Sequence, residues 1–308
     1  MNAVLRAEKL SKWYGNILGI SDINLEIGPG ITGLLGPNGA GKSTFLKIAA
    51  GQLKPKIGSL QIFGENVFAN PRLFKRIGFC PEYDCAYMEM SGWQFIMLLA
   101  RLHGFAAGAA AATCEKALAT VGLLESRDRK IKGYSFGMRQ RLRLASSILH
   151  EPELLMLDEP LRGIDPVWRI KIIQLIKEYE KQGRTVIVSS HILPEIEAMT
   201  NEIVLIHQGK IFAKGDIQRI RGLIDSHPHQ ISIHCPDPRL LAAKLVGNEY
   251  VLSLDFPAQE RSLTVKTDQR DHFFSALMRL IAVEKMAVEE ITSPDDNLQA
   301  VFDYLIGK

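Results

Sequence analysis

The 308 residues of the chain predict an α/β fold with a parallel-sheet core and helices on both of its faces, followed by a smaller α+β module. Three observations lead to this expectation. Short apolar runs alternate with segments of helical periodicity through the first 220 residues. A glycine-rich turn separates the apolar run at 31–35 from a helix. A second apolar run, at 154–157, ends in two carboxylates.

The elements of the first 220 residues follow from turn residues and periodicity. Gly28-Pro29-Gly30 ends the second strand, and Gln208-Gly209 closes a hairpin between the last two. Alternating or wholly apolar runs predict strands at 4–10, 20–27, 31–35, 58–63, 154–157, 185–189, 203–207 and 210–214. Apolar residues at helical spacing predict helices at 42–50, 90–124 (with a second helix at 113–121), 139–149, 167–181 and 194–199.

Gly, Asp, Ser, His and Pro accumulate at 221–229, so we expect a first domain at 1–220, a linker at 221–229 and a second domain at 230–308. The second domain has the order βαββαβ, which is that of a ferredoxin-like module. Its strands are expected at 230–235, 250–256, 262–267 and 287–291, and its helices at 238–246, 271–281 and 296–305. No motif in it indicates catalysis.

Composition excludes several classes of function. The hydrophobic fraction of 46% and charged fraction of 23% are those of a globular protein, and a net charge of +3 is too small to indicate nucleic-acid binding. No secretory signal and no run of about 20 apolar residues is visible, so a membrane role would require a partner. Four scattered cysteines indicate free thiols in a reducing cytosol. The segment 227–235, HPHQISIHC, could bind a metal, but a linker leading into an edge strand explains it equally well.

Residues 36–44 read GPNGAGKST and predict a phosphate-binding loop. Gly36, Gly39 and Gly41 are expected to adopt positive φ, which turns successive N–H groups inward as an anion nest at the start of a helix. Lys42 can reach the β- and γ-phosphates of a nucleotide, and the Ser43 hydroxyl can ligate Mg²⁺.

A second motif follows the apolar strand at 154–157, where Asp158 and Glu159 emerge together at its C-terminal end. Parallel sheets bind ligands at this edge, so both carboxylates should lie beside the phosphate-binding loop. Asp158 can hold Mg²⁺, and Glu159 can polarise an attacking water.

The segment 134–141, YSFGMRQR, lies between these motifs, and with it the chain resembles the nucleotide-binding subunits of ATP-binding cassette (ABC) transporters over residues 1 to about 218. The resemblance implies the P-loop fold of these ATPases, a mixed sheet with a helical subdomain at about 88–150. It also implies ATP and Mg²⁺ as cofactors. Lys42, Glu159 and His191 would be catalytic, while Ser43, Asp158 and Glu82 would hold the metal. The implied nucleotide contacts within the chain are Tyr14 (stacked on adenine), Gly36, Asn38, Gly39, Gly41, Lys42, Ser43, Thr44 and Glu82. Further contacts would come from Ser135 and Gly137, which match the family's signature motif, and from Asp165, which matches its D-loop at 163–165.

In this family Ser135 and Gly137 would contact the nucleotide bound by the opposite subunit. Each site therefore requires two chains, and two copies of this chain, or one copy and a homologue, would close around two ATP molecules. The helical region would dock on a separate transmembrane permease, placing the chain in the cytoplasm on the inner face of the membrane. No nucleic-acid partner is expected.

The sequence departs from the family pattern at three positions. Glu82 stands where the family has glutamine and adds negative charge near the γ-phosphate. Phe136 stands where glycine or lysine is usual, and its ring would either crowd the partner's nucleotide or face away into a helix contact. Leu161 replaces the usual threonine, a mild change.

The GMRQR and GIDP segments, with the C-terminal extension, resemble the ATPase subunits of ABC-2-type exporters. We therefore expect an active energy-coupling ATPase. The alternatives are a regulatory or degenerate partner with little turnover, for which Phe136 is the reason, and a non-transport ABC ATPase.

Overall fold

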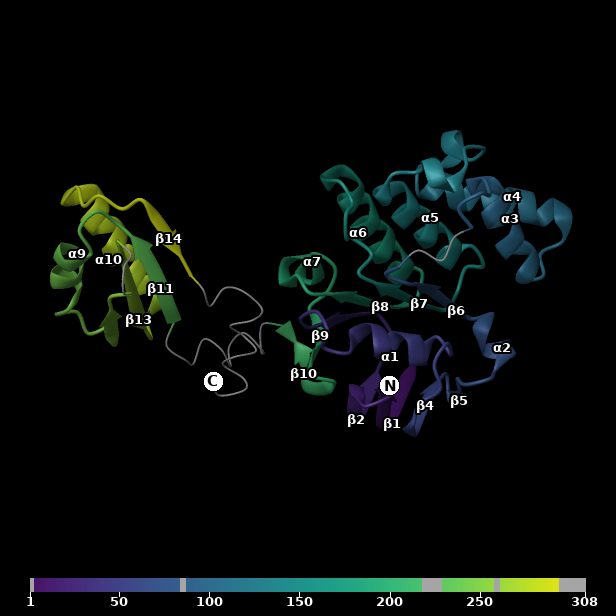
Figure 1. The fold of residues 1–308 in the computed structure, drawn as a ribbon, viewed down its shortest axis with the longest axis horizontal. Coiled ribbons are helices and arrows are strands. Elements are labelled where there is room, and N and C mark those ends of the chain that lie inside the picture. The colour runs from purple at the N-terminus through teal and green to yellow at the C-terminus, as the bar shows by residue number, and fades with distance from the viewer. Residues whose placement is uncertain (1–2, 84–86, 218–228, 258–260, 294–308) are drawn as a thin grey trace. The chain divides into compact units, whose positions relative to one another are not determined.

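The computed structural model describes residues 3–83, 87–217, 229–257 and 261–293. The chain divides into two compact units, 1–216 and 217–308 (Figure 1). The expected linker at 221–229, apart from His229, and the expected helix at 296–305 lie outside the described residues. Within the described part of the chain, no helix is long and apolar enough to cross a membrane.

A six-stranded sheet forms the centre of the first unit, in the order β10-β9-β3-β8-β7-β6. All neighbouring strands are parallel except β10, which forms an antiparallel hairpin with β9. Every residue of β7 and β8 is buried, which explains the apolar runs at 154–157 and 186–188 within them. The strands are β3 (Ile31–Leu35), β6 (Ile77–Cys80), β7 (Leu154–Asp158), β8 (Thr185–Ser190), β9 (Glu202–His207) and β10 (Lys210–Asp216).

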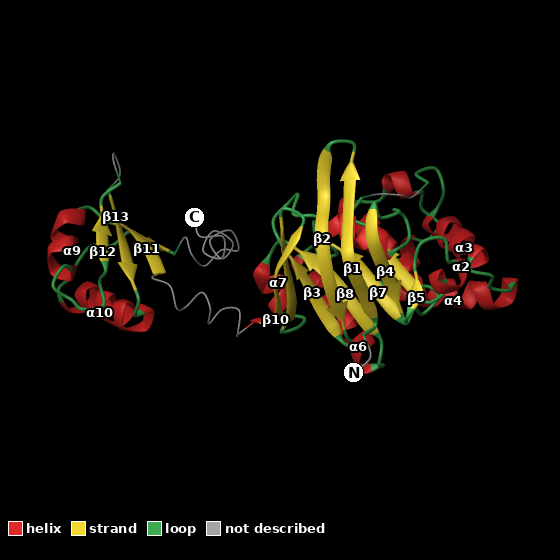
Figure 2. Cartoon of the chain, turned by 90° about the horizontal axis from the view of Figure 1, so that it is seen from below, coloured by secondary structure: helices red, strands yellow, loops and turns green. Residues whose placement is uncertain are grey.

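The amino-terminal strands form a second, antiparallel sheet with the order β2-β1-β4-β5, which Figure 2 shows beside the central sheet. Its strands are β1 (Leu5–Tyr14), β2 (Ile17–Ile27), β4 (Ile57–Ile62) and β5 (Glu65–Asn66). Helix α1 (Lys42–Ala49) lies between the two sheets (Figure 1). Its Phe45 and Leu46 are fully buried in a core to which both sheets contribute, including Leu10 and Met156. This packing fixes the start of α1, and with it the phosphate-binding loop, against the central sheet.

The other face of the central sheet is covered by α5 (Phe136–Ile148), α6 (Pro166–Lys181) and α7 (Leu193–Glu197). Helices α3 (Gly92–Leu102) and α4 (Ala107–Thr120) pack on α5 and on each other. The remaining short helices are α2 (Pro71–Phe74) and the single-turn segments Leu124–Ser126 and Ile131–Gly133. Ser91 begins α3 through a capping box with Gln94, in which each side chain bonds the other residue's N–H.

The second unit follows the expected order βαββαβ over its described residues. Its sheet has the order β12-β13-β11-β14, and every neighbouring pair is antiparallel. Ile231, Ile233, Val265 and Phe273 form its core, on one face of the sheet. The elements are β11 (His229–His234), α9 (Pro238–Leu245), β12 (Ser253–Asp255), β13 (Ser262–Thr267), α10 (Arg270–Val283) and β14 (Glu290–Thr292).

Candidate active site

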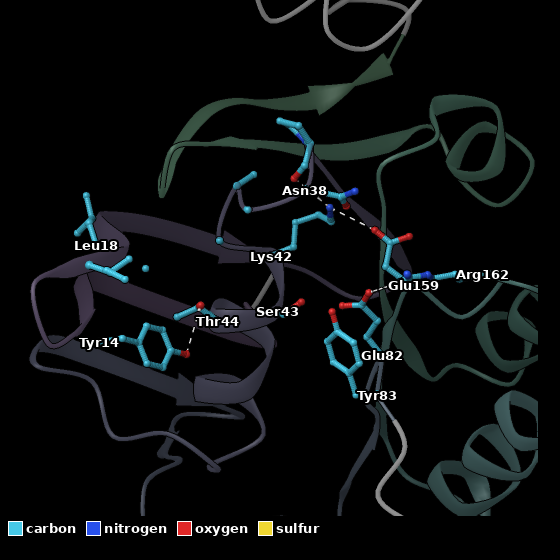
Figure 3. Close-up of a pocket in the computed structure, with 16 residues that line it drawn as sticks. Tyr14, Leu18, Asn38, Lys42, Ser43, Thr44, Glu82, Tyr83, Glu159 and Arg162 are labelled. Carbon is cyan, nitrogen blue, oxygen red and sulfur yellow. Dashed lines mark hydrogen bonds and ion pairs between the residues drawn. The ribbon is translucent and has the colours of Figure 1, made fainter. Parts of the chain in front are cut away.

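A cavity of about 450 Å³ opens beside the phosphate-binding loop (Figure 3). Nine of the residues singled out in the sequence line it: Tyr14, Asn38, Gly39, Gly41, Lys42, Ser43, Thr44, Glu82 and Glu159. Tyr14 lies at one end, 44% exposed, with its hydroxyl 3.4 Å from that of Thr44. Glu82 and Tyr83 lie at the other end, facing Ser43 (Figure 3). The cavity is therefore long, with an aromatic ring at one end and charged groups at the other.

The glycines of the loop serve two purposes. Gly39 and Gly41 have positive φ, 80° and 107°, as expected for a loop that turns its N–H groups inward. The same expectation for Gly36 is wrong, because Gly36 is not among the residues with positive φ. A Cβ at Gly36 would lie 2.1 Å from the carbonyl oxygen of Ile206, so close approach to β9 is what requires glycine there.

Lys42 and Glu159 meet at the floor of the cavity. The Lys42 ammonium donates to the carbonyl oxygen of Gly36 at 2.6 Å and lies 3.2 Å from Oε1 of Glu159. Both side chains are only 6% exposed. Because both side chains are mostly buried, solvent screens the attraction between the two charges only weakly.

Glu159 is held from two further directions. Its Oε2 lies 3.0 Å from Nδ1 of His191, and its N–H donates to the hydroxyl of Ser189. Its backbone is left-handed, with φ of 49°, which is strained for a residue with a side chain. Gln140 of α5 donates to the carbonyl oxygens of Glu159 and Pro160, at 3.3 and 3.2 Å. The strained turn that presents the carboxylate is thus tied to β8 and to α5.

Asp158 is completely buried at the end of β7, one residue before Glu159. Its Oδ1 accepts a hydrogen bond from the Ser189 hydroxyl at 2.6 Å. Its Oδ2 is buried and has no hydrogen-bond partner among the described residues. A buried carboxylate oxygen left without a donor fits a divalent cation, and the Ser43 hydroxyl in the adjacent loop is a suitable second ligand.

Ser135, Gly137 and Asp165 do not line this cavity. Ser135 caps α5 by accepting from the N–H of Met138, and Asp165 caps α6 by accepting from that of Trp168. The two loops touch, because a Cβ on Gly163 would lie 2.4 Å from the ring of Phe136. Phe136 therefore rests against Gly163 of its own chain, although 43% of the residue stays exposed.

Sequence reasoning missed three polar residues at the site. Arg162 lines the cavity and forms an ion pair with Glu82. Ser189 bonds the Asp158 carboxylate and the N–H of Glu159, and Gln140 bonds the backbone carbonyl of Glu159. Ser189 could have been found, because it pairs with Asp158 in register across parallel strands β7 and β8. Nothing in the sequence indicated Arg162.

Comparison with known proteins agrees with this geometry. Residues 20–162 match the family model described as ABC transporter. The chain is 32% identical to the bacitracin transport ATP-binding protein BcrA of Enterococcus faecalis, over all of this chain and 97% of that protein. It is 29% identical to the daunorubicin/doxorubicin resistance ATP-binding protein DrrA of Streptomyces peucetius, over 97% of this chain and 91% of that one.

Two solved structures resemble this chain. One is the ATP-binding subunit of an ABC transporter, with a TM-score of 0.66 and 26% identity over 72% of this chain and 93% of that chain. The other is a dimeric ATP-binding cassette in a post-hydrolysis state with ADP and Pi, with a TM-score of 0.65 and 20% identity over 69% of this chain and 98% of that chain; at this identity it supports the fold alone. The predicted fold of the first unit and the predicted family are confirmed. The chain belongs to the ABC transporter family, as an ATP-binding ATPase subunit of the ABC-2-type exporter group.

Proposed function

We propose that two copies of this chain close around two molecules of ATP with Mg²⁺ and that hydrolysis drives a separate transmembrane permease from the cytoplasmic face of the membrane. The observation that carries this proposal is the row of Lys42, Glu159 and His191, in which Lys42 and Glu159 line the cavity and His191 contacts Glu159. The transport and resistance roles of BcrA and DrrA, both similar along most of this chain, support export as the process that is driven.

The residues at and next to the cavity have different roles in the proposed phosphoryl transfer. Lys42 is the cation that can turn from Glu159 to the β- and γ-phosphates. Glu159 then keeps its contact with His191, and its freed Oε1 is placed to accept a proton from an attacking water. His191 holds the carboxylate in orientation. Asp158 and Ser43, with Glu82 nearby, would hold Mg²⁺, which when bound supplies charge neutralisation for the phosphate oxygens.

Ser135, Gly137 and Asp165 belong to the same proposal as groups offered to a partner's nucleotide. They lie outside the cavity of their own chain, as a site shared between two chains requires. Because Phe136 rests on Gly163, we propose that its ring supports this surface instead of blocking it, which favours an active enzyme over a degenerate partner.

The experiment is a comparison of wild type with Glu159→Gln. We expect Mg²⁺-dependent ATP hydrolysis by the wild type and a loss of at least about 100-fold in the variant, because removing a general base costs that much. The variant should still bind a fluorescent ATP analogue. If the wild type and the variant both bind nucleotide but neither hydrolyses ATP, the chain is instead a degenerate partner subunit with little turnover.

A further inference from the structure

Glu82 and Arg162 form an ion pair at the charged end of the cavity (Figure 3). Glu82 follows β6 by two residues, and Arg162 follows β7 by four, so the pair joins the loops that leave two neighbouring parallel strands. The Glu82 side chain is 16% exposed and that of Arg162 is 51% exposed. Both residues line the cavity together with Lys42 and Ser43.

A carboxylate in this place has an electrostatic cost. A nucleoside triphosphate in the cavity would bring several negative charges to the Lys42 end, and a mostly buried Glu82 would repel them with little screening by solvent. The glutamine that the family has at this position carries no charge. A compensating cation at Glu82 removes the repulsion without moving the carboxylate.

Among the residues that the structure describes, two guanidinium groups act on Glu82. Arg162 pairs with it from the cavity side. Arg143 of α5 is 2% exposed, and burial lowers the pKa of Arg143, against smaller raising effects of Cys80 and Glu82. Since Arg143 already donates to Gln140, Arg162 is the cation whose removal would leave the cavity side of Glu82 without its ion pair.

We propose that the Glu82–Arg162 ion pair takes the place of a neutral glutamine, which makes Arg162 a positioning residue for Glu82 and a determinant of nucleoside triphosphate affinity. This inference rests on the proposed binding of ATP in the cavity. It assigns a role to a residue that lies outside the loop, carboxylate and signature motifs.

Arg162→Ser and Glu82→Gln should change the Kd for nucleotide in opposite directions. Arg162→Ser leaves the Glu82 charge uncompensated, so the Kd for a fluorescent ATP analogue, measured without Mg²⁺ so that Glu82 acts only as a charge, should rise about fivefold, the upper end for a half-exposed pair. Glu82→Gln leaves the Arg162 charge uncompensated, so Kd should fall below that of wild type. The double variant should return to within about twofold of wild type, because both charges are gone.

Three further measurements distinguish charge compensation by Arg162 from a purely structural role of its side chain. Arg162→Lys keeps the charge and should hold Kd close to wild type. Arg72→Ser removes an exposed arginine of α2 outside the cavity and should leave Kd unchanged. The steady-state effect of Arg162→Ser should fall on the KM for ATP more than on kcat, and it should shrink as salt is raised.

The result that would overturn the inference is an Arg162→Ser variant with unchanged Kd. A double variant as weak as Arg162→Ser alone would also overturn it, because Arg162 would then contact the nucleotide directly. Failure of the proposed function looks different: the wild type would bind no nucleotide, or Glu159→Gln would hydrolyse ATP as fast as wild type.

Discussion

The ring of Phe136 lies so close to Gly163 that it leaves no room for a side chain at position 163. Gly163 has φ of 65°, and a Cβ there would lie 2.4 Å from two ring carbons of Phe136. Gly163→Ala should therefore lower the free energy of unfolding by about 1 kcal/mol for the backbone and by about 1 to 3 kcal/mol more for the overlap. Urea unfolding of the wild type and the variant measures the sum.

Gly183→Ala is the matched control for this prediction. Gly183 has φ of 79°, and a Cβ there would have nothing within 4 Å, so only the backbone cost should appear. In the double variant Phe136→Ala/Gly163→Ala, the loss in free energy of unfolding that is due to the overlap should disappear, because the ring is gone. Equal losses for the two alanine substitutions at glycine would show that the ring does not press on Gly163.

Ser189 gives a second prediction at this scale. Its hydroxyl donates to Asp158 and accepts from the N–H of Glu159, so it orients one carboxylate and fixes the backbone of the other. Ser189→Ala should raise the Mg²⁺ concentration needed for half-maximal ATPase activity by about tenfold, as for other partners of metal-binding groups. Ser147→Ala, which also removes a buried hydroxyl but in α5, should leave that concentration unchanged; equal shifts in both variants would refute the assignment.

Individual residues at the site were predictable where a motif fixes their place. Lys42, Ser43 and Glu159 are in such motifs, and the cavity brings them together. Arg162 was not predictable, because its role depends on a contact 80 residues away in sequence. Gly36 was wrongly explained for a related reason, since the sequence predicts the strand of Ile206 but not that this strand passes beside Gly36.

At the scale of elements, His103 and His150 join the ends of α3 and α5. Their rings stack with centroids 4.0 Å apart, and Nε2 of His150 donates to the carbonyl oxygen of Ile77 in β6. Burial lowers the pKa of His150 to about 4, with a further lowering from His103, against a small raising by the hydrogen bond to Ile77. The neutral ring is therefore part of the contact between the helical region and the central sheet.

This pKa makes stability depend on pH in a defined direction. Between pH 6.5 and 4 the unfolded chain binds a proton at His150 that the folded chain does not, so stability is complete above pH 6.5 and falls as the pH is lowered through this window. From pH 7.5 to pH 5 we expect His150 to account for a loss of about 2 kcal/mol.

Urea unfolding of wild type and His150→Gln at both pH values measures this loss. Between pH 7.5 and pH 5, the free energy of unfolding of His150→Gln should fall by about 2 kcal/mol less than that of the wild type. His272→Gln, at an exposed position of α10, should behave as wild type. Parallel pH dependence in wild type and His150→Gln would contradict the assignment.

Elements were predictable from sequence when they were long or strongly patterned. The β3 and β13 bounds match the expected 31–35 and 262–267, while β1 and β2 extend further toward their shared hairpin than expected. β6 was missed because Ile77–Cys80 has only four residues, one of them glycine. The separate antiparallel sheet was also missed, since strand patterns do not say which strands will pair.

At the scale of the whole molecule, the proposed dimer should form only when nucleotide is bound and not hydrolysed. Glu159→Gln with ATP should change from the 34.3 kDa monomer to about twice that mass by light scattering. Ser135→Arg in the same background should remain monomeric, because it places a bulky cation on the surface offered to the partner. A dimer in that double variant would contradict the role of Ser135.

The central claim is that each ATP site takes its phosphate-binding loop from one chain and its signature serine from another. The most direct measurement is ATP hydrolysis by an equal mixture of Lys42→Ala and Ser135→Ala chains, each expected to be inactive alone, because the small alanine side chain leaves the dimer surface free to close. We expect about a quarter of wild-type activity, because half of random dimers are mixed and each of these holds one site with both parts intact. A mixture no more active than the separate variants, under conditions in which the wild type hydrolyses ATP, would contradict the shared site.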